Sequence, residues 1–399
     1  MSPQQNTDSA VLIPSGLSAK SLTCVRSLGS KGITTVVASD EGAVPAIESR
    51  YCDESYSIPH RHDDLVAYKD GLLSIATRED IDTIIPNREE DAFVLSKYRD
   101  EFADHVEPIW PSMEKLRSVH DGLRLAEIAQ DAGVPTPETR LFSEVDNWDE
   151  ELIIKPRYSI LTSEYVEFLS ERECGWRLSP IHPTPGVEPD TTTVDESMRG
   201  HDPVVQEYVP IKSEYSFRAL YDHGEPVATS LRKQTRGRTY AGGASVYREM
   251  IQNSELESLG RTILDELDWH GLATVQFIED ANTGHYSFLE INPRTWTSIP
   301  TDVLSGADYP YFFSLLASGK GDEIDPNYEL GVGTHLLFGE LQYLYSVMTD
   351  EFPNADKPTI AEAMWEIGTS IYQQPNFDYL VSDDPKPFFR AIRNVILNY

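Results

Sequence analysis

The chain has 399 residues, with 66 acidic against 33 basic residues and a formal net charge of −33. The basic residues are 22 Arg and only 11 Lys, and the acidic excess is spread over the whole length. Such a charge argues against nucleic acid and anionic membranes as partners. Its low lysine content favours a salt-adapted cytoplasmic protein over an ordinary acidic enzyme. The length suits two or three packed subdomains.

The cysteines and the N-terminus add little chemistry. Cys24, Cys52 and Cys174 lie far apart without C-x-x-C spacing, so neither a zinc site nor a disulfide framework is expected. Residues 1–10 are polar, and no apolar run approaches the length of a bilayer span. We therefore expect a soluble, cytoplasmic protein.

Residues 11–110 alternate between strand and helix patterns. Val11–Ile13 is a short apolar run, Ala19–Gly29 is patterned as a helix, and residues 32–38 and 82–86 are further strands. This alternation predicts a parallel sheet with helices on its faces. The first turn offers only Gly16 and lacks G-x-G-x-x-G, so no dinucleotide site is expected.

The middle of the chain contains a helix and two separated strands. A helix is predicted over residues 121–132, and a strand over 152–156 places Lys155 at its end. Residues 158–203 are proline-rich and irregular, and residues 203–210 form the next strand. A lysine at a rigid strand end can neutralise phosphate charge. The alternative is a strand-end lysine in solvent.

A basic segment follows in this acidic chain. It comprises residues 231–245, with Arg232, Lys233, Arg236 and Arg238 ahead of a Gly-Gly pair. Anion binding by a mobile loop is the simplest interpretation, and a solvated surface loop is the alternative.

The most informative segment is the strand end Phe288-Leu-Glu-Ile-Asn-Pro-Arg. Residues two apart share a strand face, so Glu290 and Asn292 would point the same way. With a turn near Thr283, Gln276 of the preceding strand lies opposite Glu290. Oxygen ligands of this kind suit a hard divalent cation with a bound polyphosphate. The alternative is a half-buried strand that runs into a turn.

In the same hairpin, alternation places Val275, Phe277, Leu289 and Ile291 on an apolar face. Ile278 and Phe288 would then lie beside the polar cluster.

The arrangement resembles the metal-binding hairpin of ATP-grasp enzymes, whose Glu-x-Asn-x-Arg strand end follows a second metal ligand. Gln276 at that earlier position resembles carbamoyl-phosphate-synthetase-type members. The N-terminal pattern looks like the domain that precedes this fold in carboxylate–amine ligases. The resemblance covers about residues 11–320.

The resemblance implies roles for further residues. Lys155 matches the lysine that contacts the α- and β-phosphates, and Glu214 matches the ribose-binding glutamate. Glu207, Tyr208 and Val209 match the hinge whose backbone pairs with adenine. Taken singly, Glu207 and Glu214 would be read as surface carboxylates. The apolar ring contacts would be Ile278 and Phe288, which are equally plausible as core.

Two positions depart from the family pattern. The segment Arg157–Ser163 lacks the glycines that usually close over the phosphates, so Ser159, Thr162 or Ser163 hydroxyls, or the Gly-Gly pair, would substitute. Asp121 is followed by Gly122 where many members carry a cation.

The sequence therefore predicts an α/β and α+β protein in three parts. Residues 1–111 form a parallel-sheet, Rossmann-like domain, 112–305 a two-subdomain ATP-grasp domain, and 306–399 a mostly helical extension. The expected reaction is Mg-ATP-dependent ligation of a carboxylate and an amine through an acyl phosphate, with Mn²⁺ as an alternative metal. The metal ligands would be Gln276, Glu290 and Asn292, and the catalytic residues Arg294 and Lys155.

Carboxyphosphate formation from bicarbonate and a non-catalytic ATP-binding protein are the alternatives to this function. A homodimer is a further expectation.

Overall fold

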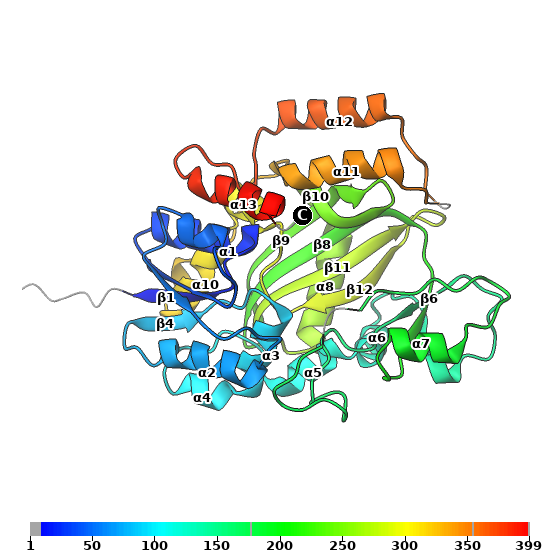
Figure 1. Ribbon diagram of the computed structural model, residues 1–399, viewed down its shortest axis with the longest axis horizontal. Helices are drawn as coiled ribbons and strands as arrows, with labels where there is room; N and C mark the ends of the chain where they lie inside the picture. Colours follow the sequence, from blue (N-terminus) through cyan, green and yellow to red (C-terminus); the bar gives the residue numbers. More distant parts are fainter. Residues whose placement is uncertain (1–8, 176–177, 353–354, 398–399) are drawn as a thin grey trace, which may run out of the picture.

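The computed structural model describes residues 9–175, 178–352 and 355–397 (Figure 1). It begins with a parallel sheet in the order β3-β2-β1-β4. Val11 and Ile13 pack with α1 and α10, whereas Leu12 packs on the opposite face with α2. This alternation produces the predicted layers. The elements are β1 (Ala10–Pro14), α1 (Ala19–Ser30), β2 (Thr34–Ser39), η1 (Pro45–Glu48), β3 (Glu54–Ser57), α2 (Leu65–Ala76), β4 (Ile81–Ile84), α3 (Glu89–Lys97) and α4 (Arg99–Ala103).

A small antiparallel sheet follows, in the order β5-β7-β6. Asp121 caps the helix α6 because its carboxylate accepts from the N–H groups of Leu123 and Arg124. Strand β7 ends at Glu207, three residues before the predicted end. The elements are α5 (Met113–His120), α6 (Gly122–Asp131), β5 (Thr139–Leu141), η2 (Phe142–Glu144), β6 (Leu152–Lys155), α7 (Thr191–Ser197) and β7 (Val204–Glu207).

The large sheet is antiparallel, in the order β12-β11-β8-β9-β10-β13. Helix α8 covers one face of it, where Leu256, Ile263 and Leu264 pack against Phe217 and Val275. The opposite face remains available to other parts of the chain. The elements are β8 (Ile211–Asp222), β9 (Glu225–Thr239), β10 (Gly242–Ile251), α8 (Ser254–Glu266), β11 (Gly271–Asp280) and β12 (Tyr286–Asn292).

The last hundred residues are mostly helical, as predicted, but they also complete the large sheet. Strand β13 pairs with β10 as its edge strand. The elements are α9 (Ile299–Ser305), α10 (Tyr309–Ala317), η3 (Gly321–Glu323), β13 (Gly333–His335), α11 (Leu337–Thr349), α12 (Ile360–Gln373) and α13 (Lys386–Leu397). Figure 1 shows α11 between the sheet and α12, with α13 beside the N-terminal domain.

Buried ion pairs fasten this extension to the large sheet and to helix α1 of the N-terminal domain. Arg236 of β9 places Nη1 2.8 Å from both carboxylate oxygens of Glu340 on α11. Arg248 of β10 pairs with Asp378, and Arg26 of α1 pairs with Asp384. The extension is therefore part of the main body of the protein.

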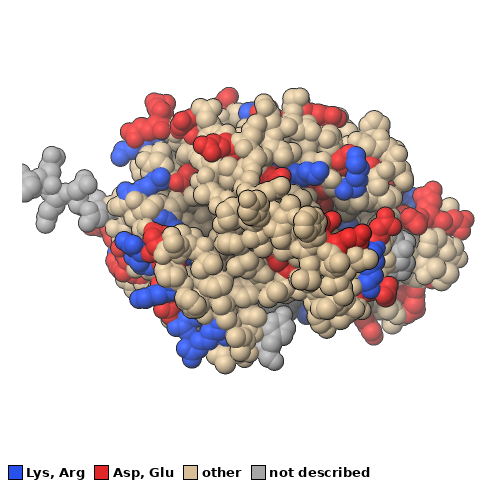
Figure 2. Space-filling model, turned by 90° about the horizontal axis from the view of Figure 1, so that it is seen from above, with Lys and Arg blue, Asp and Glu red and all other residues tan. Residues whose placement is uncertain are grey.

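One face of the molecule is poor in charge. Exposed apolar side chains gather on α11 and α12, among them Leu341, Tyr345, Met364, Trp365 and Tyr372. Seen from this side, the middle of the surface is uncharged and the Asp and Glu side chains lie around it (Figure 2). In the parts of the chain that the structure describes, no helix is both long enough and apolar enough to cross a membrane.

Candidate active site

The face of the large sheet opposite α8 is polar across four strands. Gln276 of β11 lies opposite Glu290 of β12, which is the predicted register. On the next strand, Glu214 of β8 lies opposite Ile278 on one side and Gln234 of β9 on the other. Because alternate residues of a strand share a face, these side chains form one surface.

At the β12 end of this surface, oxygen-bearing side chains are linked by hydrogen bonds. Asn292 Nδ2 donates to Glu290 Oε1 (2.9 Å), and Arg294 Nη2 donates to Asn292 Oδ1 (2.7 Å). Asn292 is 9 % exposed, and Glu290 and Gln276 are half-buried. Carboxylate and amide oxygens at one strand end fit a hard cation such as Mg²⁺.

Lys155 faces this end from the small sheet. Its Nζ donates to Gln206 Oε1 (2.5 Å). Burial lowers the pKa of Lys155, and the negative charge of Glu290 opposes that shift. The ammonium and the Glu290 carboxylate therefore interact across the gap between two sheets.

Glu214 borders a large cavity between the two sheets. Its Oε1 accepts from Gln234 Nε2 (3.1 Å), and burial raises its pKa. The cavity, of about 1180 Å³, is large enough for a nucleoside. Its walls include Leu152 and Ile153 of β6, Tyr208 of the hinge, and Tyr343 of α11. Lys155 and the β12 residues are not among the residues that line it.

The hinge residues differ in how much of their backbone is available. The N–H of Glu207 donates to Glu138 O and that of Tyr208 to Glu151 O, both over 3.0 Å. Among the described residues, the N–H of Val209 has no such partner. Val209 is therefore the hinge residue best able to pair with a base edge.

The two predicted ring contacts lie on different sides of the sheet. Ile278 is buried on the face of Glu214 and Gln276. Phe288 lies in the core with Phe277, because β12 bulges between Phe288 and Glu290. The prediction placed Phe288 on the polar face and Leu289 in the core; the extra residue of the bulge makes both placements wrong.

The glycine-free segment after Lys155 is anchored. Arg157 forms a bidentate ion pair with Asp121, whose nearest atoms are 2.7 Å apart. Its carbonyl accepts from Gly122 N (2.7 Å), and a Cβ on Gly122 would approach that carbonyl to 3.2 Å. Ile160, Leu161 and Thr162 are buried. This segment therefore packs against α6, and the close approach accounts for glycine at position 122.

The basic segment is a strand rather than a mobile loop. Residues 231–239 belong to β9 and pair with β10, so neighbouring basic side chains point to opposite faces. Arg236 is engaged by Glu340. Arg232 is 7 % exposed and donates to the hydroxyls of Ser216 (3.0 Å) and Ser245 (2.6 Å). No described carboxylate lies within ion-pair distance of Arg232, which leaves it as a candidate anion ligand.

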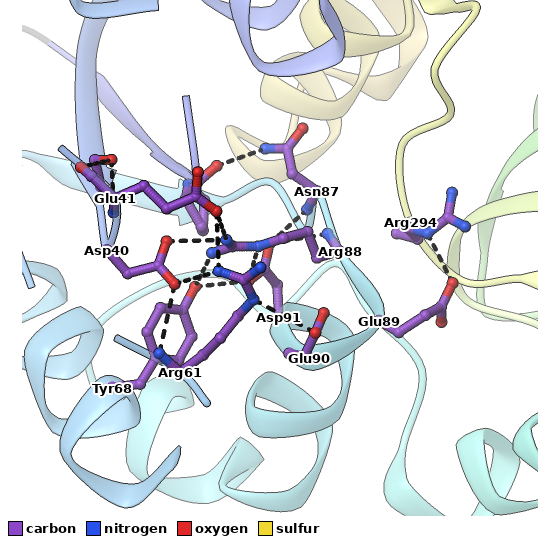
Figure 3. Close-up of polar contacts among 12 residues, drawn as sticks. Asp40, Glu41, Arg61, Tyr68, Asn87, Arg88, Glu89, Glu90, Asp91 and Arg294 are labelled. Atoms are coloured by element: carbon purple, nitrogen blue, oxygen red, sulfur yellow. Dashed lines mark hydrogen bonds and ion pairs between the residues drawn. The ribbon is translucent and has the colours of Figure 1, made fainter. Parts of the chain in front are cut away.

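Glu89 of the N-terminal domain pairs with Arg294, as Figure 3 shows. Arg294 Nε lies 2.7 Å from Glu89 Oε1, and His120 Nε2 lies 3.5 Å from Glu89 Oε2. Burial raises the pKa of Glu89, but Arg294, His120 and Lys20 together lower it to about 2. Glu89 was not among the residues predicted for this site, because its partner Arg294 lies far from it in the chain.

Comparisons with known proteins bear on the fold of the chain. A family profile described as "ATP-grasp in the biosynthetic pathway with Ter operon" matches residues 200–334, which contain β8–β12. No curated protein matches the chain.

Solved structures extend the likeness beyond that range. N5-carboxyaminoimidazole synthetase from Staphylococcus aureus is 15 % identical, with a TM-score of 0.57 over 82 % of this chain and 80 % of that one. The biotin carboxylase domain of Hydrogenobacter thermophilus 2-oxoglutarate carboxylase, solved with MgADP and bicarbonate, is 15 % identical, with a TM-score of 0.61 over 81 % and 73 %. The chain has the ATP-grasp fold.

A third structure, L-amino acid ligase from Bacillus licheniformis, is 11 % identical, with a TM-score of 0.57 over 82 % of this chain and 78 % of that one. An ATP-grasp fold is thus shared with proteins whose names describe different reactions. Assignment of a reaction to this chain depends on its own residues.

Proposed function

We propose that the protein is a Mg-ATP-dependent ligase that activates a carboxylate for attack by an amine. The observation that carries the proposal is the pairing of Gln276 on β11 with Glu290 on β12, two residues before Asn292, with Lys155 near enough for the charge of Glu290 to act on it. A cation and a set of oxygen ligands thus converge where two sheets meet, which suits a metal-bound polyphosphate.

The reaction would proceed by two displacements. A carboxylate oxygen attacks the γ-phosphorus and ADP leaves, which gives an acyl phosphate. The amine nitrogen then attacks the acyl carbon, inorganic phosphate leaves, and the nitrogen loses a proton. Positioning and charge stabilisation carry most of such phosphoryl transfers.

The chain's own residues divide this work. Lys155 would neutralise phosphate charge, and Arg294 would stabilise charge that develops on the transferred group. Gln276, Glu290 and Asn292 would hold Mg²⁺, or Mn²⁺, which when bound supplies positive charge to the phosphates. Asn292 Oδ1 now accepts from Arg294, so its use as a metal ligand would release this guanidinium for another anion.

The ribose and the adenine of the nucleotide would bind in the cavity. Glu214 would accept the ribose hydroxyls, and the backbone at Glu207, Tyr208 and Val209 would meet the adenine, with the N–H of Val209 as the free donor. Ile278 would pack on the ring from the sheet. We leave Phe288 out of this set because it lies in the core.

Two alternatives have a supporting observation each. The likeness to a carboxylase domain solved with bicarbonate favours carboxyphosphate chemistry. The anchored segment after Lys155 favours a protein that binds ATP without turnover, because that segment is tied to α6.

One experiment separates the three functions. The protein would be incubated with MgATP and hydroxylamine in molar KCl, with pooled organic acids and amino acids in one arm and bicarbonate alone in another. ADP and hydroxamate that require an organic acid support the ligase. ADP release with bicarbonate alone supports carboxyphosphate formation, and ATP binding without ADP release in either arm contradicts both.

We further propose that the protein is cytoplasmic, adapted to high salt, and paired into a homodimer through α12. Two copies with a charge of −33 repel each other unless they meet at an uncharged surface. Trp365 and Tyr372, 77 % and 87 % exposed, share one side of α12 with Gly368, beside which a Cβ would meet nothing within 4 Å. A symmetric contact at Gly368 would bury both aromatic side chains against a second copy.

A further inference from the structure

Helix α1 begins beside the proposed active site with a buried, unpaired lysine. Lys20 is 9 % exposed and lies in the first turn of this 12-residue helix. Among the described residues, its ammonium takes part in no hydrogen bond and has no carboxylate within 4.0 Å. A buried ammonium without a partner destabilises the folded protein, which suggests that a ligand pairs with it.

The neighbouring hydroxyls are unpaired as well. Ser18 is the N-cap residue of α1, but its side chain does not cap the helix. Its Oγ and that of Ser21 are buried without a hydrogen-bond partner in the described part of the chain. The first turn also contains no acidic residue. A helix N-terminus with free donors and no carboxylate is suited to an anion.

The charged groups that act on Lys20 come from two segments, the chain just after β12 and the start of α3. Arg294 of the β12 strand end and Arg88 lower the pKa of Lys20, whereas Asp91 and Glu89 raise it. Burial is the largest cause, and the pKa falls to about 7. The acidic neighbours already have other partners. Glu89 pairs with Arg294, and Asp91 accepts from the Tyr68 hydroxyl (2.6 Å).

The C-terminal extension contacts the segment just before α1. The Tyr379 hydroxyl donates to Leu17 O (3.3 Å) immediately before α1. The chain turns into α1 through Ser15 and Gly16, both with positive φ, so the backbone of this turn is held in a specific shape. Lys20, Ser18 and Ser21 therefore lie together at the start of α1, just after this turn, and the charge of Arg294 acts on Lys20.

We propose that the N-terminus of α1 binds an anionic group, a carboxylate or a phosphate, between Lys20, the hydroxyls of Ser18 and Ser21, and Arg294. The identification of this group as part of the acid substrate rests on the proposed ligase function, while anion binding itself does not. Arg294 is shared with the strand end that holds the metal ligands. An acid bound here would thus lie beside the phosphate that activates it. The expected ligand is either an acid that carries a second anionic group or an acid whose single carboxylate binds here tightly.

Binding can be measured without ATP or magnesium. Succinate and inorganic phosphate are the probes, compared with chloride at constant ionic strength. Acylation of individual lysines by acetic anhydride at pH 7, followed by peptide mass spectrometry, reports on Lys20 directly. A probe bound to Lys20 should slow its acylation several-fold and leave the acylation of the exposed Lys320 unchanged.

Variants give an independent measurement. Lys20→Met should abolish the rise in melting temperature that the probe produces, and the matched control Lys320→Met should retain it. Removal of an unpaired buried charge should leave the melting temperature without probe unchanged or higher, whereas a purely structural lysine would lower it.

Protection by succinate alone identifies a carboxylate site, and protection by phosphate alone a phosphate site. Unchanged acylation of Lys20 with both probes would overturn the proposal, even if Lys20→Met failed to fold. A ligase assay without product would contradict the proposed function and leave this measurement intact.

Discussion

Arg294 and Glu89 join the metal-type strand end to the N-terminal domain. Arg294 Nε lies 2.7 Å from Glu89 Oε1, while its Nη2 donates to Asn292 (2.7 Å). The two residues are 205 positions apart in the chain, and each side chain is 18 % exposed. The guanidinium of Arg294 thus contacts both the β12 strand end and the N-terminal domain.

This pair should make stability depend on acid pH. The pKa of Glu89 falls from 4.5 to about 2 on folding, so its contribution is fully present above pH 4.5 and is lost as the pH falls toward 2. Glu89→Gln should therefore lower the free energy of unfolding at pH 7 by about 3 kcal/mol. The difference from the wild type should shrink between pH 4.5 and 3 in urea titrations. Glu167→Gln, which removes an exposed carboxylate, should show no such convergence.

Glu290→Gln should weaken metal-dependent nucleotide binding. The substitution keeps the shape of the side chain and removes the only carboxylate among the three proposed ligands. The Kd for MgATP, measured by calorimetry, should rise by at least about tenfold, and binding of ATP with EDTA should change little. Glu279→Gln on the same hairpin is the control, because Glu279 pairs with Lys212 (2.6 Å). Equal effects of the two variants on MgATP would contradict the metal assignment.

The alternation of residues along neighbouring strands was enough to predict part of the site. Alternation along β11 and β12 placed Gln276 opposite Glu290 because that register depends on residues close in sequence. It misplaced Phe288, because a bulge is not visible in the period of hydrophobicity.

Ion pairs between residues far apart in the chain could not be predicted from the sequence. The pairing of Arg294 with Glu89 and of Arg236 with Glu340 joins segments more than 100 residues apart. Strand β13 has only three residues, too few to show a periodic pattern.

Glu340 should be important for stability rather than for chemistry. Both its carboxylate oxygens lie 2.8 Å from Arg236 Nη1, and Oε1 lies 2.7 Å from His335 Nδ1. Glu340→Ala leaves a buried guanidinium unpaired, which should cost about 3–5 kcal/mol in denaturant unfolding. Glu351→Ala breaks an exposed pair with Lys357 and should change the unfolding free energy far less than Glu340→Ala does. A similar small loss for both variants would show that α11 is held by apolar packing alone.

Potassium chloride should stabilise the protein. With a net charge of −33, acidic side chains repel one another over a distance that falls from about 10 Å at 0.1 M salt to about 3 Å at 1 M. Unfolding free energy and refolding yield should therefore rise between 0.1 and 2 M KCl. Sucrose is the control, since it favours compact states without screening charge. A gain in sucrose alone, with none in KCl, would contradict adaptation to salt.

Trp365→Glu should separate the proposed dimer without unfolding it. Trp365 is 77 % exposed on α12, so the monomer loses little packing when the ring is removed. In a symmetric contact, the substitution would place two like charges in an apolar interface, and each would lose its hydration. Sedimentation in molar KCl should show a dimer for the wild type and a monomer for the variant, with melting curves that differ only through dissociation. Leu304→Glu is the matched control, because Leu304 is 50 % exposed on α9, outside the α11–α12 face. A wild-type monomer, or a variant that stays dimeric, would remove α12 as the site of pairing.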